Sequence, residues 1–416
     1  MKAESLMADL IWRTIEDLLP DAQRFLGELI AIPSLPGQEA NAMLYCEREF
    51  LPLGVEVQRI PLFDALKNDP DYSDPVPGIA YDGRFNLRVI RAGRGGGRKL
   101  IINAHTDVVP PSEGMIDPFS PRVENGVIFG RGACDDKGQV ALLYLVLKVL
   151  HRLDRALRGD LVGHLVVEEE NGGNGTLAMA RTREKADGCL VLEASERKLF
   201  TAIRGAIWFH LVLHGQAGHS GQAGQTRSAL LMARDAIAIL ERYHASLLAS
   251  SRGLPLFDVF PDPMPITFGK LQAGNWPAAA PSQAVIEGVL GLLPNKSKER
   301  VCQEMREALT HGGDESFARN FELSFMYRHD SSVADPGHPF PQAFLASAKR
   351  VGAPVEIGAM TASCDAWLYN NQLGIPTAVF GAGSLKVAHS KDEQLALQDL
   401  AKAARVLTAF VSDYCG

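Results

Sequence analysis

The chain has 416 residues, of which 46% are hydrophobic and 22% charged, and it carries a net charge of −7 at pH 7. This composition is typical of a well-packed soluble protein, and the length predicts two domains because a single core rarely grows so large. The chain has no Lys/Arg-rich tract and no apolar run of spanning length, so we expect neither a nucleic-acid nor a membrane partner.

The residues that follow Met1 lack the basic-then-apolar order of a signal peptide. The six cysteines lie far apart without paired spacing, at Cys46, Cys134, Cys189, Cys302, Cys364 and Cys415. Reduced thiols are therefore expected in place of a disulfide framework, and the sequence predicts a cytoplasmic protein.

Apolar residues in the first half of the chain, and in one later segment, predict a buried sheet covered by helices. Helical spacing over 11–32 and a nearly all-round apolar stretch over 138–153 predict two helices, the second of them buried. Continuous apolar runs of strand length occur at 85–90, 100–103, 161–167, 189–192 and 377–380. Such runs are typical of strands buried on both faces of a parallel sheet.

A different pattern, between about residues 200 and 328, predicts a second domain inserted into the first. Its expected elements run strand, helix, strand, strand, helix, strand, at 207–213, 227–248, 266–271, 284–293, 297–309 and 321–327. This βαββαβ order is that of a ferredoxin-like split βαβ sandwich. The predicted fold is α/β, with a mixed, largely parallel sheet in a domain made of residues 1–199 and 332–416, and with the insertion at 200–331.

Histidines and carboxylates follow three of the predicted strands. His105 follows the strand at 100–103, Glu169 and Glu170 follow the strand at 161–167, and Glu193 follows the strand at 189–192. Ligands of open α/β sheets gather beyond the carboxyl ends of the strands, and imidazole nitrogen and carboxylate oxygen are the donors that zinc accepts. The sequence therefore predicts a metal site at this edge of the sheet.

Each motif also has an ordinary structural interpretation. A histidine two residues before an aspartate is commonly a hydrogen-bonded pair, Asp135 and Asp136 fit a turn, and the acids at 168–170 fit a solvated face. However, the acids continue an apolar strand, and the aspartate pair leads into a buried helix. Repulsion among clustered carboxylates must be relieved by protonation or by a metal, which favours the metal site.

His389 directly precedes Ser390-Lys391-Asp392-Glu393, which has the spacing of a capping box. This motif predicts the start of the last long helix. We therefore expect a helix N-terminus to fix the position of His389.

Taken together, these motifs resemble the di-zinc amidohydrolase family that includes acetylornithine deacetylase, succinyl-diaminopimelate desuccinylase, aminoacylase and glutamate carboxypeptidase. The resemblance covers nearly the whole chain, including the insertion, which would be a lid and dimerisation domain. It implies two Zn²⁺ per subunit, with Co²⁺ or Mn²⁺ as possible substitutes. The implied ligands are His105, Asp135 and Glu193 for one ion, and Asp135, Glu170 and His389 for the other.

Three residues are expected to be catalytic. The resemblance places Glu169 at the position of the general base, and the spacing of His105 and Asp107 favours Asp107 as the carboxylate that fixes the tautomer of the histidine. His219 resembles the histidine that reaches across a homodimer to stabilise an oxyanion in the partner's site. By itself, His219 would be an ordinary loop histidine.

Three positions depart from the family pattern. Ala278 stands where relatives have an asparagine, and Val289 and Trp367 stand where many have an arginine. Arg204, Arg227 and Arg328 are candidates for contact with a substrate carboxylate, with surface solvation as the alternative.

The expected function is hydrolysis of the amide bond of a small N-acyl amino acid-like substrate. A dipeptidase or carboxypeptidase of the same mechanism is the alternative, and a non-catalytic binding protein of the same fold is a third possibility. The identity of the acyl group and of the amine half stays open.

Overall fold

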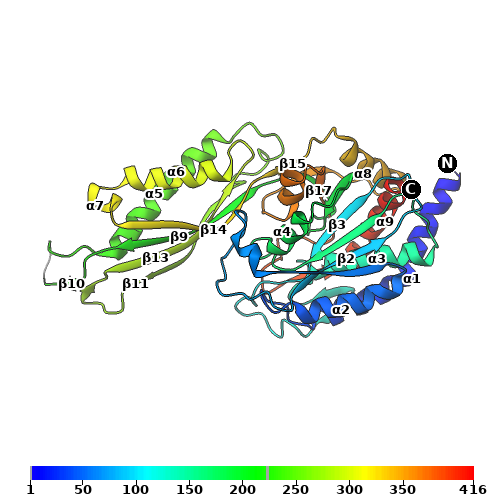
Figure 1. Ribbon diagram of the computed structural model, residues 1–416, viewed down its shortest axis with the longest axis horizontal. Helices are drawn as coiled ribbons and strands as arrows, with labels where there is room; N and C mark the ends of the chain where they lie inside the picture. Colours follow the sequence, from blue (N-terminus) through cyan, green and yellow to red (C-terminus); the bar gives the residue numbers. More distant parts are fainter. Residues whose placement is uncertain (1, 222–223) are drawn as a thin grey trace.

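The computed structural model describes residues 2–221 and 224–416, and it shows two lobes side by side (Figure 1). We call residues 205–329 the small lobe and the remaining described residues the large lobe. Each lobe has a hydrophobic core of its own. No helix within the described ranges is both long and apolar enough to cross a membrane.

Nine strands of the described chain form the sheet of the large lobe, in the order β1-β2-β6-β3-β7-β17-β8-β15, with β16 beside β8. They are β1 (Glu56–Pro61), β2 (Phe85–Arg91), β3 (Leu100–His105), β6 (Leu161–Val166), β7 (Gly188–Val191), β8 (Leu199–Ile203), β15 (Ser332–Val333), β16 (Ile357–Met360) and β17 (Thr377–Val379). The central strands β6, β3, β7 and β17 are parallel, which confirms the predicted fold class. The predicted strand at 85–90 is β2, but it runs antiparallel to β6, because an apolar run indicates burial and carries no direction.

Strand β3 shows why this sheet is covered on both faces. Alternate residues of a strand point to opposite sides. Leu100, Ile102 and Ala104 lie in the core shared with the long helices, whereas Ile101 lies in a second core with residues of β16 and η3. The helical elements of the large lobe are α1 (Lys2–Ile30), α2 (Ala40–Phe50), η1 (Leu51–Leu53), η2 (Asp64–Asn68), α3 (Lys137–Arg152), α4 (Asn174–Arg181), α8 (Pro339–Arg350), η3 (Leu368–Gln372) and α9 (Leu397–Tyr414).

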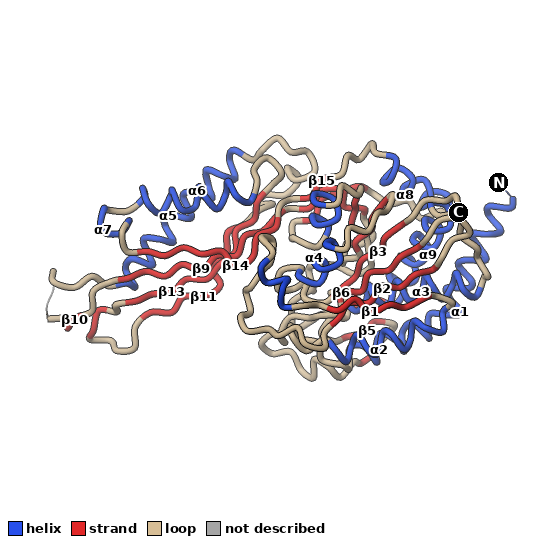
Figure 2. The backbone as a smooth tube through the Cα atoms, in the orientation of Figure 1, coloured by secondary structure: helices blue, strands red, loops and turns tan. Residues whose placement is uncertain are grey.

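The small lobe has the predicted βαββαβ order. Four antiparallel strands of its described part form a sheet in the order β11-β13-β9-β14, and α5 and α6 lie along one face of it (Figure 2). The bounds are β9 (Gly205–His214), α5 (Ala229–Ser250), β11 (Ile266–Ala273), β13 (Gln283–Leu292), α6 (Lys298–Gly312), α7 (Glu315–Ala318) and β14 (Phe321–His329). Strands β8 and β15, at the two ends of the predicted insertion, pair with each other in the large sheet.

Two small sheets complete the described fold. One is the ribbon of β10 (Gly218–His219) and β12 (Ala279–Ala280), and the other joins β4 (Arg122–Glu124), β5 (Val127–Phe129) and β18 (Gln394–Ala396).

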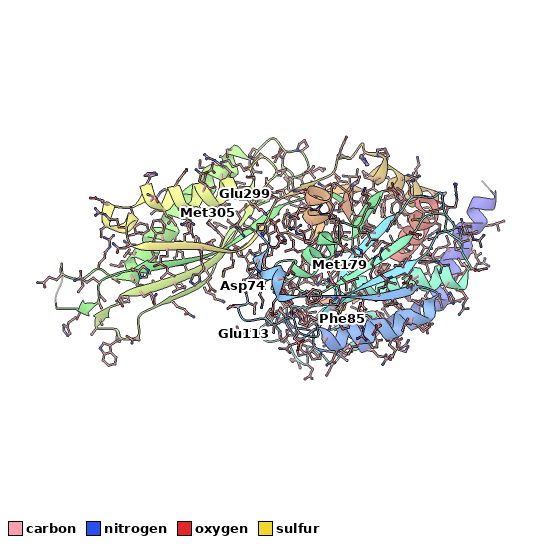
Figure 3. The ribbon with its side chains drawn as sticks, in the orientation of Figure 1. Asp74, Phe85, Glu113, Met179, Glu299 and Met305 are labelled. Atoms are coloured by element: carbon pink, nitrogen blue, oxygen red, sulfur yellow. The ribbon has the colours of Figure 1, made fainter. Side chains whose placement is uncertain are left out.

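Polar contacts join the lobes where the chain passes between them. The backbone N–H of Asp74, labelled between the lobes in Figure 3, donates to the Met326 carbonyl at 2.8 Å. Lys298 Nζ lies 2.6 Å from Asp71 Oδ1, and the buried ring of His329 is 2.9 Å from the Gly172 carbonyl through Nε2. Burial lowers the pKa of His329 to about 3, so its ring is neutral at pH 7 and Nε2 donates this bond.

A buried arginine holds the loop that follows β6. Arg84 is paired with Glu39 and Glu168, and both carboxylates are fully buried. Tyr81 and Asn174 also donate to Glu168, each at 2.9 Å. These bonds fix Glu168 directly before Glu169 and Glu170, the two glutamates predicted to belong to the site.

Replacing this arginine tests how strongly the loop depends on it. Arg84→Leu leaves two buried carboxylates without a cation, and we expect it to lower the free energy of unfolding by about 3–5 kcal/mol in urea titrations. The control is Arg122→Leu, which removes an exposed pair with Glu124 and should have a much smaller effect. Equal losses in the two variants would contradict the structural role of Arg84.

Candidate metal centre

His105 is the last residue of β3, and its ring is held in one orientation. The strand is buried along its whole length, so His105 reaches the carboxyl edge of the sheet with its side chain 2% exposed. Nδ1 lies 3.0 Å from the Asp107 carbonyl, which can only accept, so Nδ1 carries the proton. Nε2 therefore has a free lone pair, and it lies 3.3 Å from Asp135 Oδ1.

Asp107 contacts the backbone of Glu169 and Glu170. Its carboxylate accepts the backbone N–H of Glu169 at 3.2 Å and that of Glu170 at 3.0 Å. Asp107 Oδ1 is 3.4 Å from His105 Nδ1, farther than the carbonyl of the same residue. The structure thus connects Asp107 with the histidine, as expected, and additionally with the loop that carries both glutamates.

Asp135 and Asp136 stand at the N-terminus of α3, a helix that is buried except at Lys148, His151 and Arg152. Asp136 Oδ2 accepts the backbone N–H of His105 at 2.9 Å, which ties the helix to the end of β3. The sequence motifs predicted Asp135, and not Asp136, as a ligand. The structure places a carboxylate oxygen of Asp136 within the same group of donors as His105 and Asp135.

Glu193 follows β7, and its backbone carbonyl packs closely against Gly381. A Cβ on Gly381 would lie 2.3 Å from the Glu193 carbonyl, so glycine is required for this close approach. Gln139 of α3 accepts the N–H of Ala382 and donates to the carbonyls of Ala382 and Cys134. Helix α3, Glu193 and the segment 381–383 therefore form one rigid support.

The expected capping box at 390–393 is wrong. Helix α9 begins at Leu397 without a side-chain cap, and residues 390–393 form a turn before β18. The Glu393 carboxylate accepts the N–H groups of Cys134 and Asp135, each at 3.2 Å, and pairs with buried Arg131. The glutamate is thus engaged by the aspartate loop and is not available to cap a helix.

His389 is held by loop geometry in place of a helix N-terminus. Its backbone is left-handed, with φ 56°, and its carbonyl accepts a hydrogen bond from the Ser112 hydroxyl at 2.7 Å. The ring points at two carboxylates: Nε2 is 3.0 Å from Glu170 Oε1 and 3.2 Å from Asp135 Oδ2.

The side chains form two groups that share one aspartate. Within each group the possible ligand atoms lie within 4.8 Å of one another. One group contains His105, Asp135, Asp136 and Glu193, and the other contains Asp135, Glu170 and His389. The five predicted ligands thus converge, with Asp135 in the shared position, and Glu169 lies beside them, 3.9 Å from His105 Nε2 through Oε2.

The two groups contain more carboxylates than histidines. Burial, together with neighbouring carboxylates, raises the pKa values of Asp136, Glu169, Glu170 and Glu193 above their ordinary range. Burial opposes ionisation of Asp135 too, but the adjacent imidazole rings of His105 and His389 outweigh it and lower the pKa of Asp135. Burial lowers the pKa of His389, but the carboxylates of Glu170 and Asp135 raise it by more. The net result is a pKa of about 11.

These donors fit divalent cations. His105 Nε2 and Asp136 Oδ1 are buried without a hydrogen-bond partner, which is costly unless another group meets them. A cation between the carboxylates would meet the free nitrogen and remove the repulsion that raises the pKa values. Nitrogen and oxygen donors of this kind suit zinc and similar ions.

His219 is not brought to the metal centre of its own chain. It is exposed and lies in β10, at the end of the small lobe farthest from the large sheet (Figure 1). The Gly221 N–H donates to its Nδ1 at 3.0 Å. Any role in catalysis therefore requires a second copy of the chain.

The three candidate arginines are engaged elsewhere in the protein. Arg204 donates to the carbonyls of Thr361 and Gly205, Arg227 pairs with Asp314, and Arg328 donates to the Pro70 carbonyl. Trp367 is buried against His329 with a ring-centroid distance of 4.7 Å. These contacts are structural, and none of them reaches the metal donors.

A mixed sheet with two groups of metal donors at its carboxyl edge is the architecture of a dinuclear metallohydrolase. Residues 101–413 match the model of peptidase family M20/M25/M40, and the chain belongs to this family. It is therefore a metal-dependent hydrolase, as the sequence motifs predicted.

The chain is similar to curated relatives over nearly its full length. It is 27% identical to N-formyl-4-amino-5-aminomethyl-2-methylpyrimidine deformylase of Halalkalibacterium halodurans, over 96% of this chain and 97% of the relative. It is 26% identical to acetylornithine deacetylase of Myxococcus xanthus, over 97% of this chain and 100% of the relative. Among solved structures, the dipeptidase Dug1p of Saccharomyces cerevisiae shares the fold, with 14% identity, a TM-score of 0.82 and 99% coverage of both chains.

The shared position of Asp135 gives a prediction for metal content. Asp135→Ala should reduce binding of both ions, whereas His389→Ala should lose about one of two, because His389 belongs to a single group. Elemental analysis after dialysis against a divalent metal measures the ratio per chain. The control is His151→Ala at the exposed end of α3, which should keep the full content, and equal losses in the Asp135 and His389 variants would contradict a shared ligand.

Proposed function

We propose that the protein is a cytoplasmic di-zinc deacylase that hydrolyses the amide bond of a small N-acyl amino acid-like substrate. The observation that carries the proposal is the pair of donor groups joined by Asp135, with the carboxylate of Glu169 next to His105 and outside either group. A carboxylate in this position is free to act as a general base and then as a general acid.

In this proposal His105, Asp135 and Glu193 hold one ion, and Asp135, Glu170 and His389 hold the other. When bound, the ions supply Lewis acidity, which makes a water more acidic and polarises the amide carbonyl. Asp136 orients His105 through the backbone N–H. Asp107 accepts hydrogen bonds from the backbone N–H groups of Glu169 and Glu170, and so fixes the loop that carries them relative to His105.

Glu169 performs the proton transfers. Its carboxylate takes a proton from the attacking water, whose oxygen forms a bond to the carbonyl carbon. The bond from carbon to nitrogen then breaks, and Glu169 gives the proton to the leaving amine. The buried surroundings of Glu169 raise its pKa, and neighbouring cations would oppose that rise.

The names of two relatives favour a deacylase over a peptidase. One describes removal of a formyl group and the other removal of an acetyl group. The dipeptidase neighbour supports the fold alone at 14% identity. We therefore place the cleaved bond between a small acyl group and an amine.

A substrate panel tests this assignment. Zinc-loaded protein is assayed with N-acetyl and N-formyl amino acids, with N-formyl amines that lack a carboxylate, and with dipeptides. Release of acetate or formate from the first two classes supports the proposal. Cleavage confined to dipeptides would replace it by the peptidase alternative, and hydrolysis of no amide would favour a binding protein.

Substituting the proposed base should separate catalysis from metal binding. Glu169→Gln keeps the shape of the side chain but cannot accept the proton, so we expect kcat to fall by about 10²–10⁴-fold while both ions are retained. Glu241→Gln, on the exposed surface of α5, is the matched control and should leave kcat unchanged. Loss of metal from the Glu169 variant would show that this residue is a ligand instead.

We also propose a homodimer through the small lobe, in which His219 of one chain completes the site of the other. His219→Ala should lower kcat by about 10²–10³-fold without loss of metal, because an oxyanion donor is removed. Mixing the inactive His219→Ala and Glu169→Gln chains then provides the decisive measurement. Half of the random dimers are mixed and have one complete site, so about a quarter of the normal activity should return. Failure of activity to return would exclude sharing of His219 between chains.

A further inference from the structure

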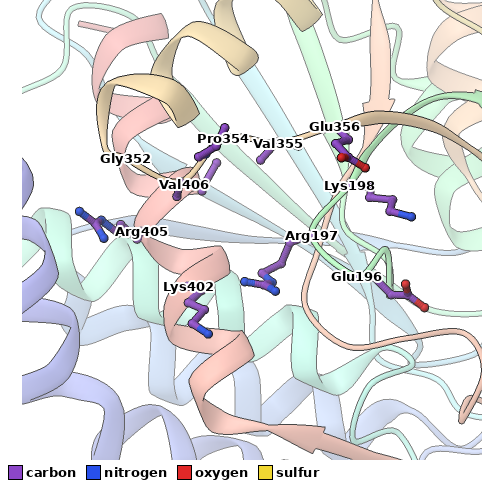
Figure 4. A pocket seen from close by; sticks show the side chains of 11 residues that line it. Glu196, Arg197, Lys198, Gly352, Pro354, Val355, Glu356, Lys402, Arg405 and Val406 are labelled. Atoms are coloured by element: carbon purple, nitrogen blue, oxygen red, sulfur yellow. The ribbon is translucent and has the colours of Figure 1, made fainter.

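A pocket lies in the large lobe, outside the metal centre (Figure 4). Its volume is about 410 Å³, which is enough for a small metabolite. Three segments line it: the turn between β7 and β8, the loop between α8 and β16, and the middle of α9. None of its lining residues is one of the metal donors.

The charged side chains of this pocket are mostly basic. Arg197, Lys198, Lys402 and Arg405 line it together with two carboxylates, Glu196 and Glu356. Four cations and two anions leave an excess of two positive charges, in a chain whose net charge is −7. In Figure 4, Arg197, Lys402 and Arg405 lie toward one end of the pocket, and Glu196, Lys198 and Glu356 lie toward the other.

The cations at the basic end are only partly compensated. Arg197 Nε lies 3.4 Å from Asp399 Oδ1, whereas Lys402 and Arg405 form no ion pair with the described part of the chain. Nε of Arg197 and Nε of Arg405 are buried and have no hydrogen-bond partner. Glu196 is compensated by Lys386, whose Nζ is 2.9 Å away. The Arg405 guanidinium lies over the Trp12 ring, 5.3 Å from its centroid. Guanidinium groups that lack a hydrogen bond at Nε, beside a cavity, favour an anionic ligand.

The turn that carries Arg197 is directly connected to the metal centre. It begins two residues after Glu193, and the N–H groups of Glu196 and Arg197 donate to the carbonyls of Gly383 and Gly381, at 2.8 and 3.0 Å. Gly381 packs against the carbonyl of Glu193. Glu196 and Arg197 both have left-handed backbones, with φ 53° and 60°. Since such conformations are costly outside glycine, a ligand that binds the Arg197 side chain would stabilise the turn as a whole.

We propose that this pocket binds a small anion with two or more phosphate or carboxylate groups, and that binding there strengthens the hold of Glu193 on the metal centre. The basic end supplies hydrogen-bond donors for the anion. The turn that carries Arg197 transmits the effect of anion binding to Glu193. The coupling half of the proposal rests on the proposed role of Glu193 as a ligand. The binding half is independent of it.

Binding is tested first, on the metal-loaded full-length protein. Isothermal titration calorimetry is performed with fructose 1,6-bisphosphate for phosphate and with tricarballylate for carboxylate. We expect at least one of them to bind, and Lys402→Glu to weaken its Kd by about ten-fold or more because a repulsive charge replaces an attractive one. Lys185→Glu, an exposed lysine that does not line this pocket, is the matched control and should bind like the unchanged protein. Absence of binding by both anions, or equal weakening in both variants, would overturn the site.

Coupling is tested by release of metal into a chelator, a readout that does not require turnover. Saturation with the binding anion should slow release of the more labile ion by about five-fold or more. The effect should vanish in Lys402→Glu and persist in Lys185→Glu. An unchanged release rate in the presence of bound anion would overturn the coupling. Because neither measurement uses a substrate, failure of the deacylase assignment would leave both outcomes interpretable.

Discussion

The structure depends on one electrostatic constraint: carboxylates that end buried strands and begin a buried helix must be neutralised without water. Asp135, Asp136, Glu169, Glu170 and Glu193 all lie at the carboxyl edge of the large sheet, and burial of this kind favours their protonated forms. Two histidines cannot balance five acids. The arrangement is stable as a set of ionised ligands only when cations stand among them, which links folding of this edge to metal binding.

The protein neutralises the surrounding carboxylates with its own arginines. Arg84 is paired with Glu39 and Glu168, and Arg131 is paired with Glu393. These buried pairs hold the backbone of the loops from which the inner carboxylates project. Arginine suits this outer position because its planar donors bind two acceptors at once, whereas the inner position is left to groups with a free lone pair, as at His105 Nε2.

Much of the fold and of the site was predictable because the signals are local. A buried strand shows itself as an apolar run, and a ligand at its end is the next polar residue, as for His105 and Glu193. Glu393 was misinterpreted because Ser390 and Glu393 have the spacing of a capping box, while the actual partners of Glu393, at Arg131 and Asp135, are more than 250 residues away in the chain. The direction of β2 and the engagement of Arg204 and Arg328 were likewise hidden, because they depend on contacts between distant segments.

The same long-range contacts distinguish Glu193 from the other proposed ligands. His105 is fixed by a strand within the sheet and Asp135 by a buried helix, so neither can move without disturbing a core. Glu193 is followed by a short turn whose support comes from the segment 381–383, through the bonds of Ser195, Glu196 and Arg197. That segment continues to His389, which belongs to the other donor group. A change in the turn can therefore reach both groups along the backbone, whereas a change at His105 would have to pass through the sheet.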